Sequence, residues 1–358
     1  MKKNSRILLV AILLVSLFSS CENKVSMLTV IHKDGSLHRE VSFLADSTVM
    51  RGKDTSNKCF ARILESNQWT KKWNASEKDS RKSKLMCKAS RDFASASEMA
   101  EAYPLTIGGK SILKDCRLER HFKGFYTDYT FSETYNDFSS LFKIPLIKYL
   151  DKEAASYWLT GKPNVMEGKS GYETQEYLEN MNRQFDRWLT ANIMNDVIDV
   201  LVDNYDSLKG IPISRKEILI KRDSLINYAS EKGLSLANGS LGIGRTISTF
   251  FHSDYFMEPC KDNGFVDRKL QNKIELIFEG LSLLDVDYQL TMPGTKIIDC
   301  GQGIIKDNVI SFRLTGVRLL SRDYTISASF RSTNYWAFIV TLLVIIIAVW
   351  TSVRLKKK

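Results

Sequence analysis

The sequence predicts an α+β fold: an antiparallel sheet from N- and C-terminal strands, a helical block inserted between them, and one C-terminal transmembrane helix. Three observations support this prediction. Apolar and polar residues alternate near both ends of the chain, which is typical of half-buried strands. Between about residues 137 and 280, apolar residues recur every three to five positions, as in amphipathic helices. An uncharged apolar stretch, Tyr335 to Val353, then precedes a basic tail.

Residues 1–20 have the three parts of a secretion signal. Basic residues near the N-terminus precede the apolar run Ile7 to Leu17, and small residues follow. This run of 11 residues is too short to span a bilayer. The segment Leu17-Phe18-Ser19-Ser20-Cys21 resembles the lipobox of bacterial lipoproteins, which implies a diacylglycerol on the Cys21 sulfur, with palmitate as an acyl chain. An ordinary secretion signal with a chance cysteine is the alternative.

Residues 21–136 are predicted to be the β-rich N-terminal part of the exported body. It opens as a hairpin in which Asp34-Gly35 is a two-residue turn. The residues expected on one face of this hairpin are Leu28, Val30, His32, Leu37, Val41 and Phe43. Further strands are expected around Trp69 to Trp73, Leu85 to Ala89 and Leu113 to Tyr135, with Phe125, Thr127, Tyr129 and Phe131 on one face of the last. A capping box at Ser95 to Glu98 predicts a short helix before Pro104.

Residues 137–280 form the predicted helical block. Its longest helix is expected over Tyr172 to Asp206, where large apolar residues recur with helical spacing. A capping box at Ser214 to Glu217 predicts a second helix that ends at Tyr228, and Phe265 to Glu279 a third.

Residues 281–331 return to strict alternation and are predicted to form a β-meander. The apolar rows are Leu284, Val286, Tyr288, Leu290 and Met292, then Ile310, Phe312 and Leu314, and finally Tyr324, Ile326, Ala328 and Phe330. Because strands occur at both ends of the body, we expect the terminal strands to share one sheet. That closure would bring both membrane anchors toward the same membrane face.

The stretch from residue 335 to 353 is predicted to be a transmembrane helix. Nineteen residues at about 1.5 Å each give roughly 28 Å, close to the thickness of the hydrocarbon core. Tyr335, Trp336 and Trp350 lie where aromatic rings favour the membrane interface, and the basic residues 354–358 should stay cytoplasmic. A buried core helix is the alternative. The two anchors together predict a cytoplasmic-membrane protein with an extracytoplasmic, periplasmic body.

The net charge of +10 is concentrated in these anchors. Three basic residues precede residue 7 and four follow residue 353, so the exported body carries only +3. This distribution argues against a nucleic-acid partner. A basic cluster over Lys71 to Arg91 could bind anionic lipid head groups or acidic glycans, although a solvated hairpin face is favoured. Proximity suggests the cysteine pairs Cys87 with Cys116 and Cys260 with Cys300.

The terminal regions resemble a known family. Asp34-Gly35 in an early hairpin, Tyr288 to Gly294 with its Met-Pro-Gly, and a terminal helix with a basic tail are similar to LppM-type bacterial lipoproteins. This resemblance implies an exported α/β domain associated with lipid binding. The long helical block departs from a compact domain of that type. More broadly, the chain resembles uncharacterised lipoproteins of Bacteroides-like bacteria.

Several motifs contain residue types that could carry chemistry. Gly109-Lys110-Ser111 and Gly168-Lys169-Ser170 imitate the end of a phosphate-binding loop, but proline stands where that loop needs its first glycine. Gly239, Gly242 and Gly244 are expected to form a flexible connection rather than an anion site. One stripe of the long helix could bind a cation or act as acid and base, but is expected to be its wet face: Asn192, Asp196, Asp199, Asp203 and Asp206. The histidines His32, His38, His121 and His252 are scattered.

The sequence therefore assigns no catalytic, cofactor-binding or metal-binding residue, and Cys21 is the single modification site that it predicts. We expect an envelope lipoprotein that binds membrane lipid or another envelope protein. The alternatives are an extracytoplasmic hydrolase with a site in the helical block, and a structural or assembly factor of an envelope complex.

Overall fold

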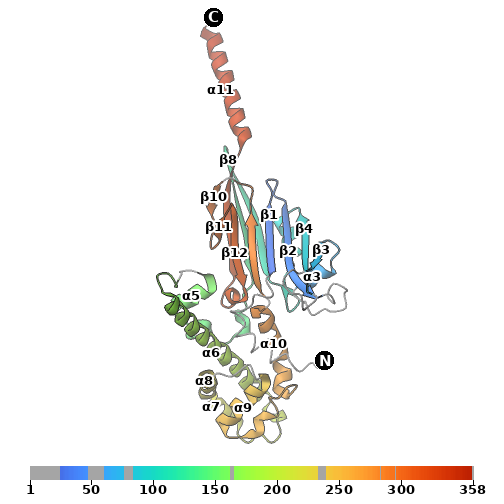
Figure 1. Cartoon of the computed structure of the whole chain (residues 1–358), viewed down its shortest axis with the longest axis vertical. Coiled ribbons are helices and arrows are strands. Elements are labelled where there is room, and N and C mark those ends of the chain that lie inside the picture. The colour runs from blue at the N-terminus through green and yellow to red at the C-terminus, as the bar shows by residue number, and fades with distance from the viewer. Residues whose placement is uncertain are drawn as a thin grey trace. The chain divides into compact units, whose positions relative to one another are not determined.

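The computed structural model describes residues 25–46, 60–75, 84–161, 165–232, 239–282, 284–294 and 296–356. These residues divide into two compact units. A sheet unit comprises Val25–Tyr135, Val286–Leu314 and Tyr324–Lys358, and a helical unit comprises Asn136–Asp285 and Thr315–Asp323. Both ends of the described chain therefore belong to the sheet unit, and the helical unit is inserted between its strands (Figure 1). The predicted α+β class is confirmed.

The sheet unit contains thirteen described strands in three sheets. Its elements are β1 (Val25–Ile31), β2 (Leu37–Asp46), α3 (Ala61–Glu65), β3 (Thr70–Ala75), β4 (Lys84–Phe93), α4 (Ala96–Glu101), β5 (Thr106–Ile107), β6 (Lys110–Ser111), β7 (Leu113–Lys123), β8 (Tyr126–Tyr135), β9 (Asp285–Thr291), β10 (Lys296–Asp299), β11 (Ile304–Lys306), β12 (Val309–Thr315), β13 (Tyr324–Thr333) and α11 (Tyr335–Lys356). The larger sheets have the orders β11-β12-β9-β1-β2-β4-β3 and β10-β13-β8-β7, and β5 with β6 forms a small hairpin.

Terminal strands pair with one another, as the sequence predicts, but in two sheets rather than one. In the seven-stranded sheet β1 lies beside β9, and in the four-stranded sheet β13 lies beside β8. The C-terminal strands are divided between both sheets instead of forming a single meander. The pair β1 and β9 is parallel, with Met27 opposite Tyr288, whereas β8 and β13 are antiparallel. A parallel pair is possible here because a long crossover, which includes the helical unit, separates β1 from β9.

The two larger sheets pack face to face through their apolar rows. The rows predicted for β9, β12 and β13 are buried, and Thr127, Tyr129 and Phe131 of β8 point inward as expected. Phe125, which the sequence predicts on the same face, precedes β8 in the turn and is exposed. The largest fully buried side chains of this core are Arg39, Tyr103, Tyr135, Tyr288, Phe43, Phe131, Phe330, Met27 and Leu37. Alternation with period two therefore places one side of each strand in a common core.

The first hairpin differs from the prediction by one residue. His32 N donates to Ser36 O at 2.9 Å, so three residues form the loop, and Gly35 adopts φ +96° at its end. The pairing is then Ile31 with Leu37 and Met27 with Val41. As a result, Val25, Met27, Thr29 and Ile31 of β1 are buried, not Leu28, Val30 and His32. A change of one residue in loop length moves the inward face of a strand to its other side.

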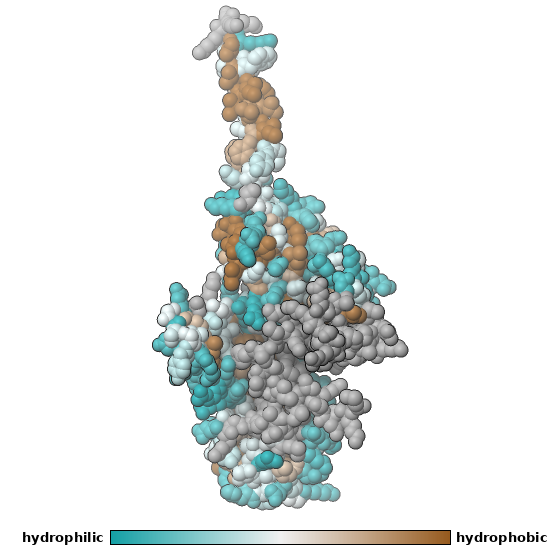
Figure 2. Space-filling view, in the orientation of Figure 1, coloured by the Kyte–Doolittle hydropathy of each residue, from teal (hydrophilic) through white to brown (hydrophobic). Residues whose placement is uncertain are grey.

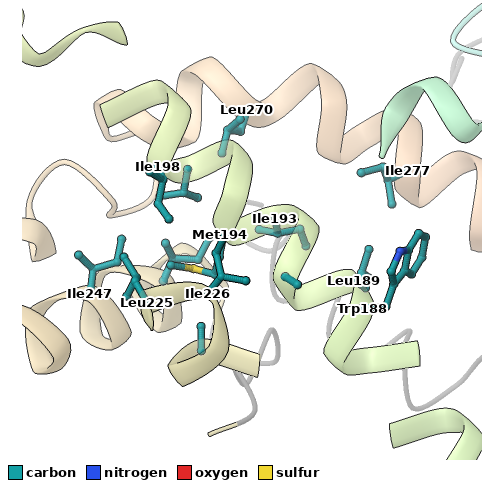
Figure 3. Packing of buried hydrophobic residues seen from close by; sticks show 14 of the residues in the cluster. Trp188, Leu189, Ile193, Met194, Ile198, Leu225, Ile226, Ile247, Leu270 and Ile277 are labelled. Carbon is teal, nitrogen blue, oxygen red and sulfur yellow. The ribbon is translucent and has the colours of Figure 1, made fainter. Parts of the chain in front are cut away.

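The helical unit is built around one long helix. Its elements are α5 (Lys152–Thr160), α6 (Gly171–Asp203), α7 (Arg215–Ile220), α8 (Arg222–Lys232), α9 (Gly239–Phe251) and α10 (Phe265–Ser282). Ser170 and Glu173 form a capping box at the start of α6. Side chains of α6, including Trp188, Met194 and Ile198, pack against Leu225 and Ile226 of α8, Ile247 of α9, and Leu270 and Ile277 of α10 (Figure 3).

Two helix predictions in this unit need correction. The helix expected from Ser214 to Tyr228 is two helices, α7 and α8, which are separated at Lys221. Gly239, Gly242 and Gly244 are not a flexible connection, because all three lie within α9. A Cβ at Gly244 would lie 3.1 Å from Phe256 O and 3.2 Å from the Cys260 Cβ. This glycine therefore permits the close approach of the following segment, which sequence reasoning interpreted as flexibility.

Gly316 has the closest backbone contact of this kind in the helical unit. A Cβ added there would lie 1.8 Å from Gly280 O, on α10, and 2.9 Å from Leu281 Cα. Gly316 N also donates to Leu284 O at 2.9 Å. The segment at residues 315–323 can therefore pack against α10 only while residue 316 lacks a side chain.

Replacing Gly316 with alanine should destabilise the helical unit, since backbone rather than a flexible side chain must move. We expect a loss of roughly 1–3 kcal/mol or more in the free energy of unfolding. The matched control is Gly171→Ala, at the first position of α6, where a Cβ meets nothing within 4 Å. Denaturant unfolding of both variants tests this, and equal stability for the two would contradict it.

Candidate functional site

The helix α11 is long and apolar enough to cross a membrane. The apolar segment Tyr335–Leu355 has 21 residues, which corresponds to about 32 Å, and its apolar window is not buried by the rest of the chain. Figure 2 shows it as a hydrophobic column. The alternative prediction of a buried core helix is therefore wrong.

A single residue, Asn334, joins α11 to β13 and binds the tip of the β7–β8 hairpin. Its backbone N donates to Phe125 O at 2.8 Å, and its side-chain Nδ2 donates to Gly124 O at 2.8 Å. Thr127 Oγ1 donates to Asn334 Oδ1 at 3.1 Å. The Asn334 carbonyl accepts from Ala337 N, in the first turn of α11, at 3.0 Å. Three of these bonds attach the start of the helix to the hairpin, and the fourth closes the first turn of α11.

Aromatic side chains surround this connection. The ring centroids of Phe122 and Trp336 are 5.9 Å apart and nearly parallel, and those of Phe125 and Phe338 are 4.7 Å apart. Tyr126 meets Phe338 edge to face at 6.5 Å. We call these five residues the junction cluster. All of them keep large exposed fractions, from 39% for Phe125 to 61% for Phe122, so the rings are not a buried core.

Charged side chains lie next to the junction cluster on the sheet side. Arg331 donates through two nitrogens to the two oxygens of Asp128, at 2.7 and 2.9 Å, and Lys123 Nζ lies 2.8 Å from the same carboxylate. Hydrogen bonds from Arg331 and Lys123 hold the pKa of the Asp128 carboxyl well below its usual range. The Arg331 guanidinium also lies 5.5 Å from the Tyr126 ring centroid.

A second polar group lies between the two large sheets. Arg39 of β2 and Glu133 of β8 form an ion pair at 2.5 Å, and both side chains are fully buried. Arg39 Nη2 also donates to Thr29 Oγ1 at 2.7 Å and to Tyr288 Oη at 3.1 Å. Tyr135 Oη donates to the other Glu133 oxygen at 2.7 Å, and Tyr103 Oη donates to Tyr135 Oη at 3.2 Å. This network connects the facing sheets through side chains from five elements or loops.

Burial and charge determine the ionisation of this network. Burial is the largest single influence and lowers the pKa of Arg39, but the charges of Glu133 and of the tyrosine hydroxyls together raise that pKa well above its ordinary value. Burial is the main cause that raises the pKa of Tyr103, Tyr135 and Tyr288 far above 10, and the negative charge of Glu133 is the second cause. The ion pair therefore connects the two sheets and is surrounded by neutral hydroxyl groups. This geometry indicates a structural role.

Sequence reasoning missed this pair, although both partners interrupt an apolar row. Arg39 stands between Leu37 and Val41 on the inward face of β2. Glu133 stands between Phe131 and Tyr135 on the inward face of β8. Opposite charges at inward positions of two strands are a detectable signal, because single buried charges are rarely tolerated.

The carboxylate stripe of α6 is only partly the wet face that the sequence predicts. Asp203 and Asp206 are exposed, but Asn192 and Asp196 are 2% and 7% exposed. Asp196 pairs with Lys273 of α10 and with Lys143, and Asp199 pairs with Lys143 and Arg222 of α8. Burial raises the pKa of Asp199, yet hydrogen bonds from Lys143 and Arg222 lower it overall. These carboxylates join segments of the unit through ion pairs.

Asn192 has a similar structural role. Its Oδ1 accepts from Ile144 N at 2.9 Å, and its Nδ2 donates to Ile144 O and Trp188 O at 3.2 and 3.0 Å. The stripe therefore satisfies backbone groups and cations of its own unit. Within the described ranges, no three His, Cys, Asp or Glu side chains are grouped to hold a metal ion.

The other motifs have local structural roles. Lys110 and Ser111 form β6 after a turn at Gly108 and Gly109, and Ser170 caps α6. Cys87, Cys116, Cys260 and Cys300 are free thiols, so the pairs suggested by proximity are not formed. Cys87 and Cys116 lie in different sheets, and Cys260 and Cys300 in different units. Burial raises the pKa of Cys87 to about 11 and of Cys260 to about 12, which keeps these thiols protonated.

The four histidines are not brought together. His38 Nδ1 lies 2.6 Å from Asp92, His121 Nε2 lies 3.4 Å from Glu119, and His32 is exposed in the first loop. His252 follows α9 with φ +53° and belongs to the other unit. The signal segment, Cys21 and Cys59 lie outside the described residues, as does part of the basic cluster from Lys71 to Arg91.

Removing one member of the Arg39–Glu133 pair should strongly destabilise the sheet unit. Arg39→Met leaves the Glu133 charge buried without its partner, which should cost about 3–5 kcal/mol in the free energy of unfolding. The neighbouring Glu40 pairs with Lys88 at the surface, so Glu40→Gln should cost less than about 1 kcal/mol. The double variant Arg39→Met/Glu133→Leu should recover most of the loss. Denaturant unfolding measures all three, and a similar loss for Arg39→Met and Glu40→Gln would argue against a buried pair.

The buried tyrosines should make the sheet unit sensitive to alkali. Because burial raises the folded pKa of Tyr288, the folded state keeps a proton that the unfolded chain releases near pH 10. This stability is complete below about pH 10 and declines as the pH rises further. We expect Tyr288→Phe to reduce the steepness of that decline. Unfolding curves measured on both sides of pH 10 test this, and an identical pH dependence in the variant would contradict the expectation.

Comparison with protein-family models, curated proteins and solved structures finds no match. The resemblance to LppM-type lipoproteins therefore stays a prediction from short terminal motifs. Met292 and Gly294 of that motif pack near the end of β9, where a Cβ at Gly294 would lie 2.9 Å from Arg331 O. The geometry of the junction and of the two units is thus the basis for a functional proposal.

Proposed function

We propose that this chain is a membrane-tethered binding module of the bacterial cell envelope. Its sheet unit lies on the extracytoplasmic side of the cytoplasmic membrane, held by α11 and by a lipid on Cys21. The basic tail after α11 remains in the cytoplasm because positive flanks resist translocation. The module binds a lipid or an envelope protein close to the membrane surface.

The observation that carries this proposal is the continuity between β13 and α11. One residue separates the strand from an apolar helix, and that residue is hydrogen-bonded to the neighbouring hairpin. A helix attached by a flexible linker would leave the body free at a distance from the bilayer. Here the attachment is short and bonded, which favours a module that works at the membrane surface.

An exposed apolar edge supports a binding role. Strand β11 lies at the edge of the seven-stranded sheet, and β10 at the edge of the four-stranded sheet. Ile304 and Ile305 of β11 are 74% and 50% exposed, and Ile298 of β10 is 47% exposed. Open strand edges with apolar side chains are surfaces to which an extended partner segment can add. These edges therefore favour an envelope protein over a lipid as the ligand.

The alternative of a hydrolase loses the observation that motivated it. That reading depended on the carboxylates of α6 as acid, base or cation ligands, whereas Asp196 and Asp199 are paired with lysine and arginine side chains. A structural or assembly factor remains compatible with a tethered module. Stable isolation with a membrane complex would distinguish an assembly factor from a reversible binding module.

Membrane extraction tests the two anchors separately. Cys21→Ser should abolish labelling by palmitate while α11 still holds the protein in carbonate-washed membranes. Adding Ile345→Arg and Ile346→Arg to that variant should release it, because each charge costs about 2.5–3.5 kcal/mol at the centre of a span. Val353→Arg is the matched control, since it lies beside the basic tail and can reach the interface.

Release of the wild-type protein by carbonate would refute the tether. Retention of the variant with two central arginines in the Cys21→Ser background would show that α11 is not the second anchor. A photoreactive residue at Ile304, with Lys110 as the exposed control position, then tests the edge. We expect a discrete protein crosslink from residue 304 alone, and crosslinks to lipid alone would instead assign lipid as the ligand.

A further inference from the structure

We propose that the tip of the β7–β8 hairpin is a second membrane contact of the sheet unit. Phe122, Phe125 and Tyr126 would lie in the interfacial layer of the same leaflet through which α11 enters. The occupant of this aromatic surface is the phospholipid bilayer itself. The inference rests on the proposed transmembrane span of α11 and adds to it a fixed placement of the sheet unit.

The depth of the tip follows from its contacts with the helix. Trp336 and Phe338 are the second and fourth residues of α11, so they lie within about 5 Å of its start along the axis. Phe122 stacks on Trp336 with an interplanar angle of 8°, and Phe125 meets Phe338 at 4.7 Å. A helix that enters the bilayer at Tyr335 therefore brings the hairpin rings to the level of its own first turn.

The composition of the tip suits this layer. The turn consists of Gly124 and Phe125, and Gly124 has φ +67°, which allows a tight reversal. Phe122, Phe125 and Tyr126 are 61%, 39% and 40% exposed. Exposure of aromatic rings to water is unfavourable, because their large apolar surface is stabilised by burial. Aromatic rings with a polar neighbour are favoured at the boundary between hydrocarbon and water.

The charged residues next to the tip complete the match. Lys123 and Arg331 both bind the Asp128 carboxylate, and Arg331 also lies over the Tyr126 ring. Aromatic rings beside the helix, with charged side chains behind them, give the order expected from hydrocarbon to water. Lys123 and Arg331 bring two positive charges against one negative charge, which is compatible with phosphate groups of the lipid surface.

A bilayer fits this surface better than a protein partner. The exposed rings are continuous with the apolar side chains of α11, including Ile339 and Leu342, which must be covered by lipid once the helix spans. A protein bound to the tip would have to occupy the head-group layer around the helix. The hydrogen bonds of Asn334 hold the hairpin and helix together, so the two contacts prevent the sheet unit from pivoting about α11.

Depth-dependent quenching in the full-length protein tests this inference. The protein would be reconstituted into phosphatidylcholine vesicles whose acyl chains carry bromine near the head groups. Phe125→Trp and Phe122→Trp each add one indole at the tip and keep an aromatic side chain. Lys110→Trp is the matched control, because it is exposed and lies near the opposite end of the β7 hairpin. Circular dichroism confirms that each variant is folded.

We expect brominated lipid to remove most of the emission added at positions 122 and 125 and none of the emission added at position 110. Unquenched emission from both tip variants, with the α11 tryptophans still quenched, would overturn the second contact while leaving the span intact. Unquenched emission from Trp336 and Trp350 as well would overturn the span, and the inference would fall with it. The two failures are therefore distinguishable.

Discussion

The buried ion pair between Arg39 and Glu133 is the interaction on which the sheet unit depends. It joins the two facing sheets at a position where both side chains are inaccessible to water, and the hydroxyls of Thr29, Tyr135 and Tyr288 form further hydrogen bonds to it. Two unpaired charges in that core would oppose folding, so the sheets must align to within hydrogen-bond distance at this point. Strand β8, which carries Glu133, pairs along its whole length with β13, whose continuation is α11. The strand that supplies one partner of the buried pair is therefore hydrogen-bonded to the strand that leads into α11.

The junction at Asn334 determines how α11 is attached to the sheet unit. Asn334 links the end of β13, the tip of the β7–β8 hairpin and the first turn of α11 through side-chain and backbone hydrogen bonds. A hydrophobic helix alone would locate the chain in a membrane without fixing how its body is held. With the aromatic tip as a second contact, the sheet unit would be held in one orientation, and its β11 edge would stay at a constant height above the bilayer. Such an arrangement suits a module that presents one surface to a partner in the same membrane.

Charged residues inside the helical unit have a comparable structural role. Asp196 and Asp199 connect α6 to α8, to α10 and to the segment at Lys143. Viewed along the sequence, they form an acidic stripe that suggests either solvent or a cation. Along the chain, Lys143 lies 56 residues from Asp199, Arg222 lies 23 residues from Asp199, and Lys273 lies 77 residues from Asp196. The acidic stripe could have been a solvent-exposed face, a metal site or an ion-pair network. Partners far away in the sequence make it an ion-pair network, and no local sequence pattern reveals them.

The sequence by itself determined the α+β class, the helical insertion, the inward rows of β9, β12 and β13, and the apolar helix at the C-terminus. These features follow from hydrophobic periodicity and segment length, which are local properties of the chain. The tertiary structure decided the face of β1, which depended on one residue in a loop, and the division of the C-terminal strands between two sheets. It also decided the partners of Arg39, Asp196 and Asp199, and the contact of Phe122 and Phe125 with α11. Each of these depends on residues far apart in the sequence, whose meeting is set by packing of the whole unit rather than by the pattern of any one segment.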